Sequence, residues 1–76
     1  MEQLQKVLTR ARRDEIVSEA QTREIEEAYC LERADRADAN WKRLAVGSFV
    51  RVAEGGGLSD REAARLITIM RGQSLA

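Results

Sequence analysis

The chain has 76 residues, of which 34% are charged, with 13 acidic and 13 basic side chains and no histidine. A chain of this length forms one domain near the lower size limit for stabilisation by burial alone. Its single cysteine excludes an internal disulfide, and without histidine the common zinc ligand sets are missing, so we expect neither a metal site nor a cofactor. Self-association or a partner remains as a source of further stability.

Residues 1–46 contain neither glycine nor proline, and only 4% of the chain is aromatic. Glycine and proline are the residues that most strongly interrupt regular structure, so this composition predicts helix rather than sheet. We therefore expect an all-α fold in which residues 1–76 form a single helical domain. The expected architecture is a small bundle of three helices, or four if the long middle helix breaks.

The first expected helix covers about residues 2–13. Its apolar residues recur at spacings of three and four and share one face: Leu4, Val7, Leu8 and Ala11. The next apolar residues, Ile16 and Val17, would fall on the opposite side of a continuous helix, which favours a turn near 13–17. Ser18, with Gln21 three residues later, has the pattern of a capping box and predicts a new helix start.

The middle helix is expected to run from about 18 to 54 as one long central helix. From Cys30 onward six residues follow alternating steps of four and three, as in a coiled-coil seam: Cys30, Ala34, Ala37, Trp41, Leu44 and Ser48. This seam predicts a helical-hairpin or coiled-coil-like homodimer with Cys30 as a small core residue. A break near residues 38–40, with Asp38 or Asn40 capping a following helix, is the alternative.

Three consecutive glycines open a turn over residues 55–58, and a last helix is expected over about 59–71. Ser59 and Glu62 repeat the capping-box pattern of Ser18 and Gln21. Two such short patterns are common in helical proteins and the segments between them differ, so the sequence does not predict an internal repeat. The last helix should fold back onto the surface formed by 44–53.

The charge is unevenly distributed. Residues 14–32 carry seven acids against Arg23, a net charge of −6, and the segments on both sides are basic. This pattern could pair neighbouring helices or two subunits. Exposed ion pairs contribute at most about 1 kcal/mol each, so the pattern guides orientation more than stability.

The sequence favours a protein without enzymatic activity. The most common general base, histidine, is absent, and the acids lie along helix faces that we expect to be exposed. No stretch is long and apolar enough for a membrane span, and the N-terminus does not read as a secretory signal. The unpaired cysteine fits a reducing compartment, so we expect a cytoplasmic protein, of bacterial or phage origin from its arginine and alanine content, without a small-molecule substrate.

Binding to another protein is the function that the sequence favours, as a regulator, adaptor or inhibitor. Aromatic residues and arginines often anchor interfaces. The residues expected to contact a second copy or a partner are Tyr29, Ala34, Ala37, Trp41, Leu44 and Phe49. For Trp41 and Phe49 the alternative, that they fill the core, carries about equal weight, because so small a core needs every large side chain.

Nucleic-acid binding is the alternative function. Arginines cluster at the end of the first expected helix and recur on the last one, giving the candidate set Arg10, Arg12, Arg13, Arg61 and Arg65. The helix over 59–71 would then read DNA or RNA. A net charge of zero weighs against this interpretation, because nucleic-acid binding relies on a basic surface.

Overall fold

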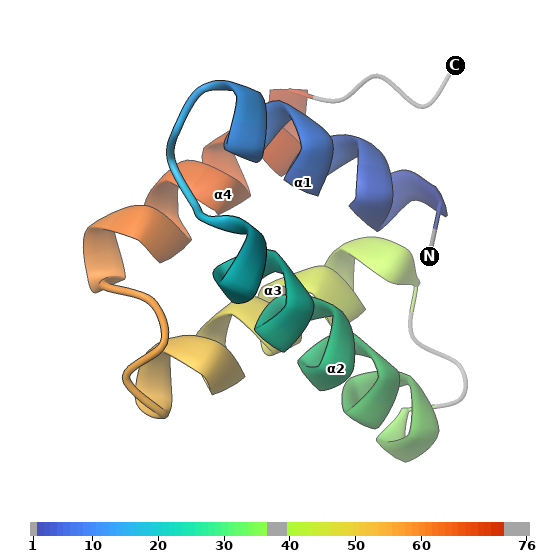
Figure 1. Cartoon of the computed structure of the whole chain (residues 1–76). Coiled ribbons are helices and arrows are strands. Elements are labelled where there is room, and N and C mark those ends of the chain that lie inside the picture. Colours follow the sequence, from blue (N-terminus) through green and yellow to red (C-terminus); the bar gives the residue numbers. More distant parts are fainter. Residues whose placement is uncertain (1, 37–39, 73–76) are drawn as a thin grey trace.

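The computed structural model describes residues 2–36 and 40–72 and folds them into four helices, with no strand in these two ranges (Figure 1). This confirms the expected all-α class and the small helical bundle. The helices are α1 (Glu2–Arg13), α2 (Glu19–Asp35), α3 (Trp41–Glu54) and α4 (Asp60–Gly72).

The expected long helix over 18–54 is wrong, because the chain forms α2 and α3 there. Asn40 caps the start of α3, as expected from the alternative with a helix break near residues 38–40. Its side-chain oxygen accepts a hydrogen bond from the backbone N–H of Arg43 at 3.1 Å. Asp38, the other cap considered, lies outside the described residues. The break lets α2 pack against α3 within one chain. A straight helix would have left that apolar surface to a partner or to water.

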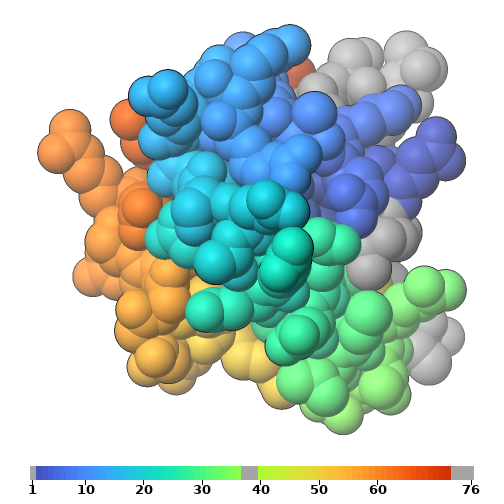
Figure 2. Space-filling view, in the orientation of Figure 1, coloured from blue at the N-terminus to red at the C-terminus, as the bar shows by residue number. Residues whose placement is uncertain are grey.

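The four helices pack as two layers, with α1 and α2 in front of α3 and α4 (Figure 1). α1 packs against α4 and α2 packs against α3, while α3 also contacts α4. In the space-filling view, α1 and α2 cover the near face and the segment joining α3 to α4 reaches its left edge (Figure 2). The core between the layers draws on every helix, and its most enclosed large side chains are Leu4, Leu8, Ile25, Phe49 and Leu66.

The turns after α1 and after α3 have the same geometry. In each, one residue has a positive φ, Glu15 at 60° and Gly56 at 85°. The next residue, Ile16 or Gly57, donates its N–H to a carbonyl five residues earlier at 2.9 Å. This is the Schellman ending of a helix, which satisfies the last carbonyls by a left-handed residue. One turn uses glycine at that position and the other uses a glutamate.

Both turns lead into a complete capping box. The hydroxyls of Ser18 and Ser59 accept from the backbone N–H groups of Gln21 and Glu62, at 3.2 and 3.1 Å, and both side chains reach back to the serine N–H. The two boxes also touch each other. The Gln21 amide donates to the Glu62 carboxylate at 3.4 Å and to the Gly57 carbonyl at 3.0 Å, so it joins α2 to the α3–α4 turn and to α4.

The two helix pairs, α1–α2 and α3–α4, share their buried positions at an offset of 41 residues. The buried residues of α1 (4, 7, 8 and 11) correspond to buried residues 45, 48, 49 and 52 of α3, and Val17 corresponds to Leu58. Residues 22, 25 and 29 of α2 likewise correspond to buried residues 63, 66 and 70 of α4. With residues 2–31 aligned to 43–72, the identical pairs are only Arg10 with Arg51 and Ser18 with Ser59. The structure therefore contains one helix–turn–helix burial pattern twice, which the dissimilar side chains conceal in the sequence.

Candidate functional site

A groove of about 740 Å³ runs along α3, between the end of α2 and the end of α4. We call it the α3 groove. Its apolar lining includes Val46, Val50 and Met70. Its charged lining comes from α2 and α3 and comprises Glu32, Arg36, Lys42, Arg43, Arg51 and Glu54. A depression that combines an apolar floor with several charged groups is the usual form of a binding site.

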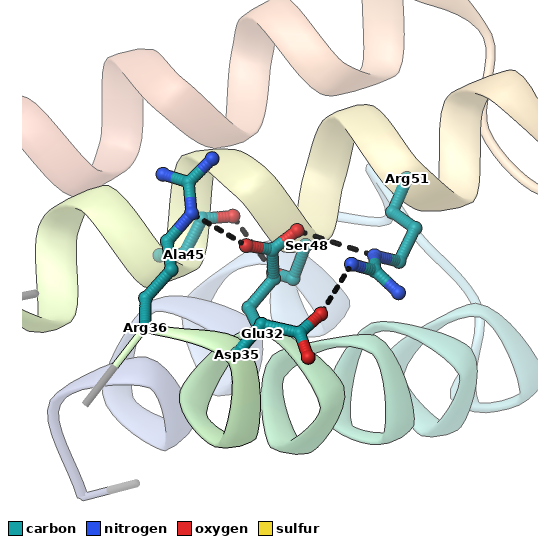
Figure 3. A network of polar contacts seen from close by, with 6 residues as sticks. All are labelled: Glu32, Asp35, Arg36, Ala45, Ser48 and Arg51. Carbon is teal, nitrogen blue, oxygen red and sulfur yellow. Dashed lines mark hydrogen bonds and ion pairs between the residues drawn. The ribbon is translucent and has the colours of Figure 1, made fainter.

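Glu32 forms the inner wall of the α3 groove and is buried, with 6% of its surface exposed. Two arginines approach its carboxylate from opposite sides: Arg36 Nε lies 3.3 Å from one oxygen and Arg51 Nε lies 3.2 Å from the other (Figure 3). Arg51 also contacts Asp35 at 3.3 Å. An unpaired buried carboxylate costs several kcal/mol, so the arginines make this position tolerable for an acid. The resulting network ties α2 to α3.

Gly47 is the residue of α3 that faces this carboxylate. A Cβ atom at Gly47 would lie 2.8 Å from the Glu32 carboxyl carbon, closer than side chains can approach. Glycine inside a helix costs about 1 kcal/mol relative to alanine, and here it provides the space that the buried acid occupies. Behind it, the buried Ser48 hydroxyl is satisfied by donating to the Ala45 carbonyl at 2.7 Å (Figure 3).

The charged ends of α3 oppose its helix dipole. Lys42 and Arg43 lie in its first turn, where the dipole favours acids, and Glu54 is its last residue, where the dipole favours bases. None of the three has an ion-pair partner within 2–36 and 40–72. Charged residues that do not stabilise the helix on which they lie often mark functional positions. These three are therefore the strongest candidates on this face for contacting another molecule.

A second, smaller depression of about 240 Å³ adjoins the α3 groove and shares Arg51 with it. We call it the α2 depression. It is lined by Glu24, Glu27 and Leu31 of α2. Leu31 is 54% exposed and Val50, in the α3 groove, is 46% exposed. Both are large apolar side chains in contact with water, and they lie in the two depressions that meet at Arg51.

The residues expected to mediate protein contacts are dispersed by the fold. Tyr29, Leu44 and Phe49 are buried in the core of one chain, with exposed fractions of 2%, 5% and 0%. Burial also raises the pKa of the Tyr29 phenol, an effect that the nearby Arg33 charge partly offsets. Trp41 is partly buried and packs against the core. Ala34 is exposed, and Ala37 lies outside the described residues.

The expected coiled-coil seam does not form a continuous surface. Its first residue, Cys30, is exposed, which corrects the interpretation of this cysteine as a small core residue. Its last residues, Leu44 and Ser48, are buried inside the same chain. The reason is the break before Asn40: once α2 and α3 are separate helices, the regular spacing across residues 30–48 no longer lies on one helix face.

The arginines considered for nucleic-acid binding are all exposed and lie on α1 and α4. Arg10 lies 3.8 Å from Asp14 in an exposed pair. The other four, Arg12, Arg13, Arg61 and Arg65, form no ion pair with a described residue.

The residues of the network around Glu32 were not among the candidates predicted from the sequence, although the sequence contains two indications of them. Glu32 and Arg36 are spaced i, i+4, which predicts an ion pair on one helix. Gly47 interrupts an otherwise regular helix, and an isolated helical glycine often marks a close approach by another element. Neither signal identifies the partner, because Glu32 and Gly47 are 15 positions apart and their contact depends on how α2 packs on α3.

Comparisons with protein-family models, with curated proteins and with solved structures found no significant match to this chain. Within the described ranges, no helix is long and apolar enough to cross a membrane, and no group of three or more acidic or cysteine side chains is placed to hold a metal ion. The geometry of the α3 groove and its surroundings is therefore the basis on which a function can be inferred.

Proposed function

We propose that this chain is a small non-enzymatic protein-binding module that acts as a regulator, adaptor or inhibitor in the cytoplasm, and that it also forms a homodimer. The binding surface is the α3 groove together with the α2 depression. The proposed ligand is a protein segment rather than a small-molecule substrate.

One observation carries this proposal: in the α3 groove, cations that form no ion pair with a described residue lie beside apolar side chains. Lys42 and Arg43 supply the positive charge, and Val46, Val50 and Met70 supply the apolar contact. An amphipathic helix that binds in a groove presents this combination in complementary form, with apolar anchors at helical spacing and charged residues beside them. The expected partner segment therefore carries apolar residues flanked by acids.

A pair of synthetic helical peptides tests the proposal. One carries leucine along one face with flanking glutamates, and the other has lysine in place of each glutamate. We expect the acidic peptide to bind at least about tenfold more tightly at low salt, because charge complementarity selects the partner. Titration calorimetry measures both affinities. Lys42→Ala with Arg43→Ala should remove the preference, while Arg61→Ala with Arg65→Ala on α4 serves as the matched control. Equal affinity for the two peptides would contradict the proposal.

Nucleic-acid binding is the second candidate function, and the observation in its favour is the exposure of Arg12, Arg13, Arg61 and Arg65 without ion-pair partners among the described residues. Titration with random duplex DNA at low and high salt tests it. Phosphate contacts release counterions, so genuine binding must weaken steeply with salt and must weaken further when these arginines become alanine. Binding that fails either condition excludes this candidate.

A further inference from the structure

The outer face of the α2–α3 hairpin carries opposite charges at its two ends. The two helices run antiparallel, since Glu32 lies against Gly47 while Glu24 lies against Gly57. One end of the face therefore holds the end of α2 and the start of α3, with the cations Lys42 and Arg43, which form no ion pair with a described residue. The other end holds the earlier part of α2 and the end of α3, with the acids Glu24, Glu27 and Glu54.

The middle of the same face is apolar and electrically balanced. Leu31 and Val50 are the two large apolar side chains that are most exposed among the described residues, and they line the two depressions that share Arg51. Two guanidinium groups there, of Arg36 and Arg51, are already bound to the two carboxylates of Glu32 and Asp35. Covering this centre would therefore bury apolar surface without leaving an unpaired charge, which is the condition under which burying ionic groups is tolerated.

A surface with one acidic end, one basic end and an apolar centre is complementary to itself. We propose that a second copy of this chain docks on it, about a two-fold axis that passes near Arg51. The rotation places the basic end of one copy against the acidic end of the other, and brings Leu31 and Val50 of both copies together. This inference rests on the proposed function, because it names the dimer surface of the proposed module.

The arrangement of charge on α3 supports this assignment. Lys42 and Arg43 at its start and Glu54 at its end are each placed against the helix dipole, so they do not serve the stability of α3 itself. In an isologous dimer each contact occurs twice, once on either side of the two-fold axis, so the cations of each copy face the acids of the other. A second copy and an acidic partner segment would also occupy the same face, so dimerisation and partner binding should exclude each other.

Two charge-reversed variants test the dimer surface. The first, Lys42→Glu with Arg43→Glu, makes both ends of the face acidic, and the second, Glu27→Lys with Glu54→Lys, makes both ends basic. The changes on α3 agree with its dipole and Glu27 is exposed, so both variants should keep the fold. Sedimentation over a concentration series measures association, and circular dichroism checks helix content.

We expect the wild type to dimerise and each variant alone to lose at least about tenfold in dimer affinity, because like charges meet across the axis. An equimolar mixture of the two variants should restore association as a heterodimer, which native mass spectrometry resolves. Arg61→Glu with Arg65→Glu on α4 is the matched control, since it changes the net charge as Lys42→Glu with Arg43→Glu does, but away from the face. This control variant should dimerise as the wild type does.

The following outcomes would overturn the inference. If both variants dimerise like the wild type, or if their mixture stays monomeric, the interface lies elsewhere. If the wild type is monomeric at every concentration, the homodimer fails as a whole, whereas the acidic peptide test still decides protein binding by the α3 groove. The two proposals can therefore fail separately.

Discussion

At the scale of single residues, Arg51 organises the outer face of the α2–α3 hairpin. It bridges the buried Glu32 and the exposed Asp35, and it lies where the two depressions meet. Its two acidic partners differ sharply in exposure, 8% against 67% for their side chains. Because solvent screens the exposed pair, the structure predicts that the two contacts contribute very differently to stability.

Arg51→Ala should lower the free energy of unfolding by about 2 kcal/mol, since it removes a charged hydrogen-bond partner from the buried Glu32. Asp35→Ala, the matched control on the other side of the same guanidinium, should cost less than about 0.5 kcal/mol. Urea denaturation followed by circular dichroism measures both. Equal costs for the two substitutions would show that Glu32 does not depend on Arg51.

At the scale of elements, two neighbouring glycines of the Schellman turn after α3, Gly55 and Gly56, provide a matched pair. Gly56 has a positive φ and open space around its missing Cβ, so alanine there meets backbone strain and no clash. Gly55 has a φ of −81°, and a Cβ there would make only ordinary contacts at 3.6 and 3.7 Å. Their substitution by the same residue therefore isolates the cost of the left-handed conformation.

Gly56→Ala should lower the free energy of unfolding by about 1 kcal/mol, while Gly55→Ala should be neutral or stabilise by about 0.5 kcal/mol. In the other turn, Glu15→Gly should stabilise by a similar amount, because Glu15 occupies the same left-handed position without the freedom of glycine. Thermal denaturation of the three variants measures the differences. Identical effects at 55 and 56 would be inconsistent with the two φ values.

The second capping box predicts a dependence on pH. The backbone N–H of Ser59 and the amide of Gln21 donate to the Glu62 carboxylate and hold its pKa below its usual value. Protonation of Glu62 thus requires a lower pH in the folded chain than in the unfolded chain. The stability that it contributes is fully present above the unfolded pKa, about 4.3 for glutamate, and is lost as pH falls through the lower folded value.

Glu62→Gln should therefore flatten the dependence of the melting temperature on pH in the acidic range where Glu62 titrates. The chain contains a natural precedent for the substitution, since Gln21 fills the same position in the first box. A series of melting curves from pH 7 to pH 3, with Glu27→Gln at an exposed position of α2 as a control, measures the difference. Parallel curves for wild type and Glu62→Gln would contradict the assigned role.

At the scale of the whole molecule, the fold consists of two successive helix pairs, α1–α2 and α3–α4, and the proposed dimer surface lies on the outer face of the α2–α3 hairpin. The same burial pattern recurs after 41 residues with almost entirely different side chains. The two helix pairs differ most in the residues outside this pattern, such as the cations at the start of α3. The charge-reversal experiment addresses this scale, because it tests whether two whole molecules recognise each other through opposite ends of one face.

The sequence by itself determined the local structure. The absence of glycine and proline over 1–46, the spacing of apolar residues in 2–13 and the two capping boxes depend on neighbours along the chain, and the helix class, the turn before Ser18 and the last helix follow from them. Only the tertiary structure decided which apolar residues α2 and α3 bury against each other and how Glu32 meets Arg51. Regular spacing over 30–48 suits one helix with a partner as well as two helices that pack together. The choice between them depends on contacts between segments distant in sequence, whose free energy no local pattern records.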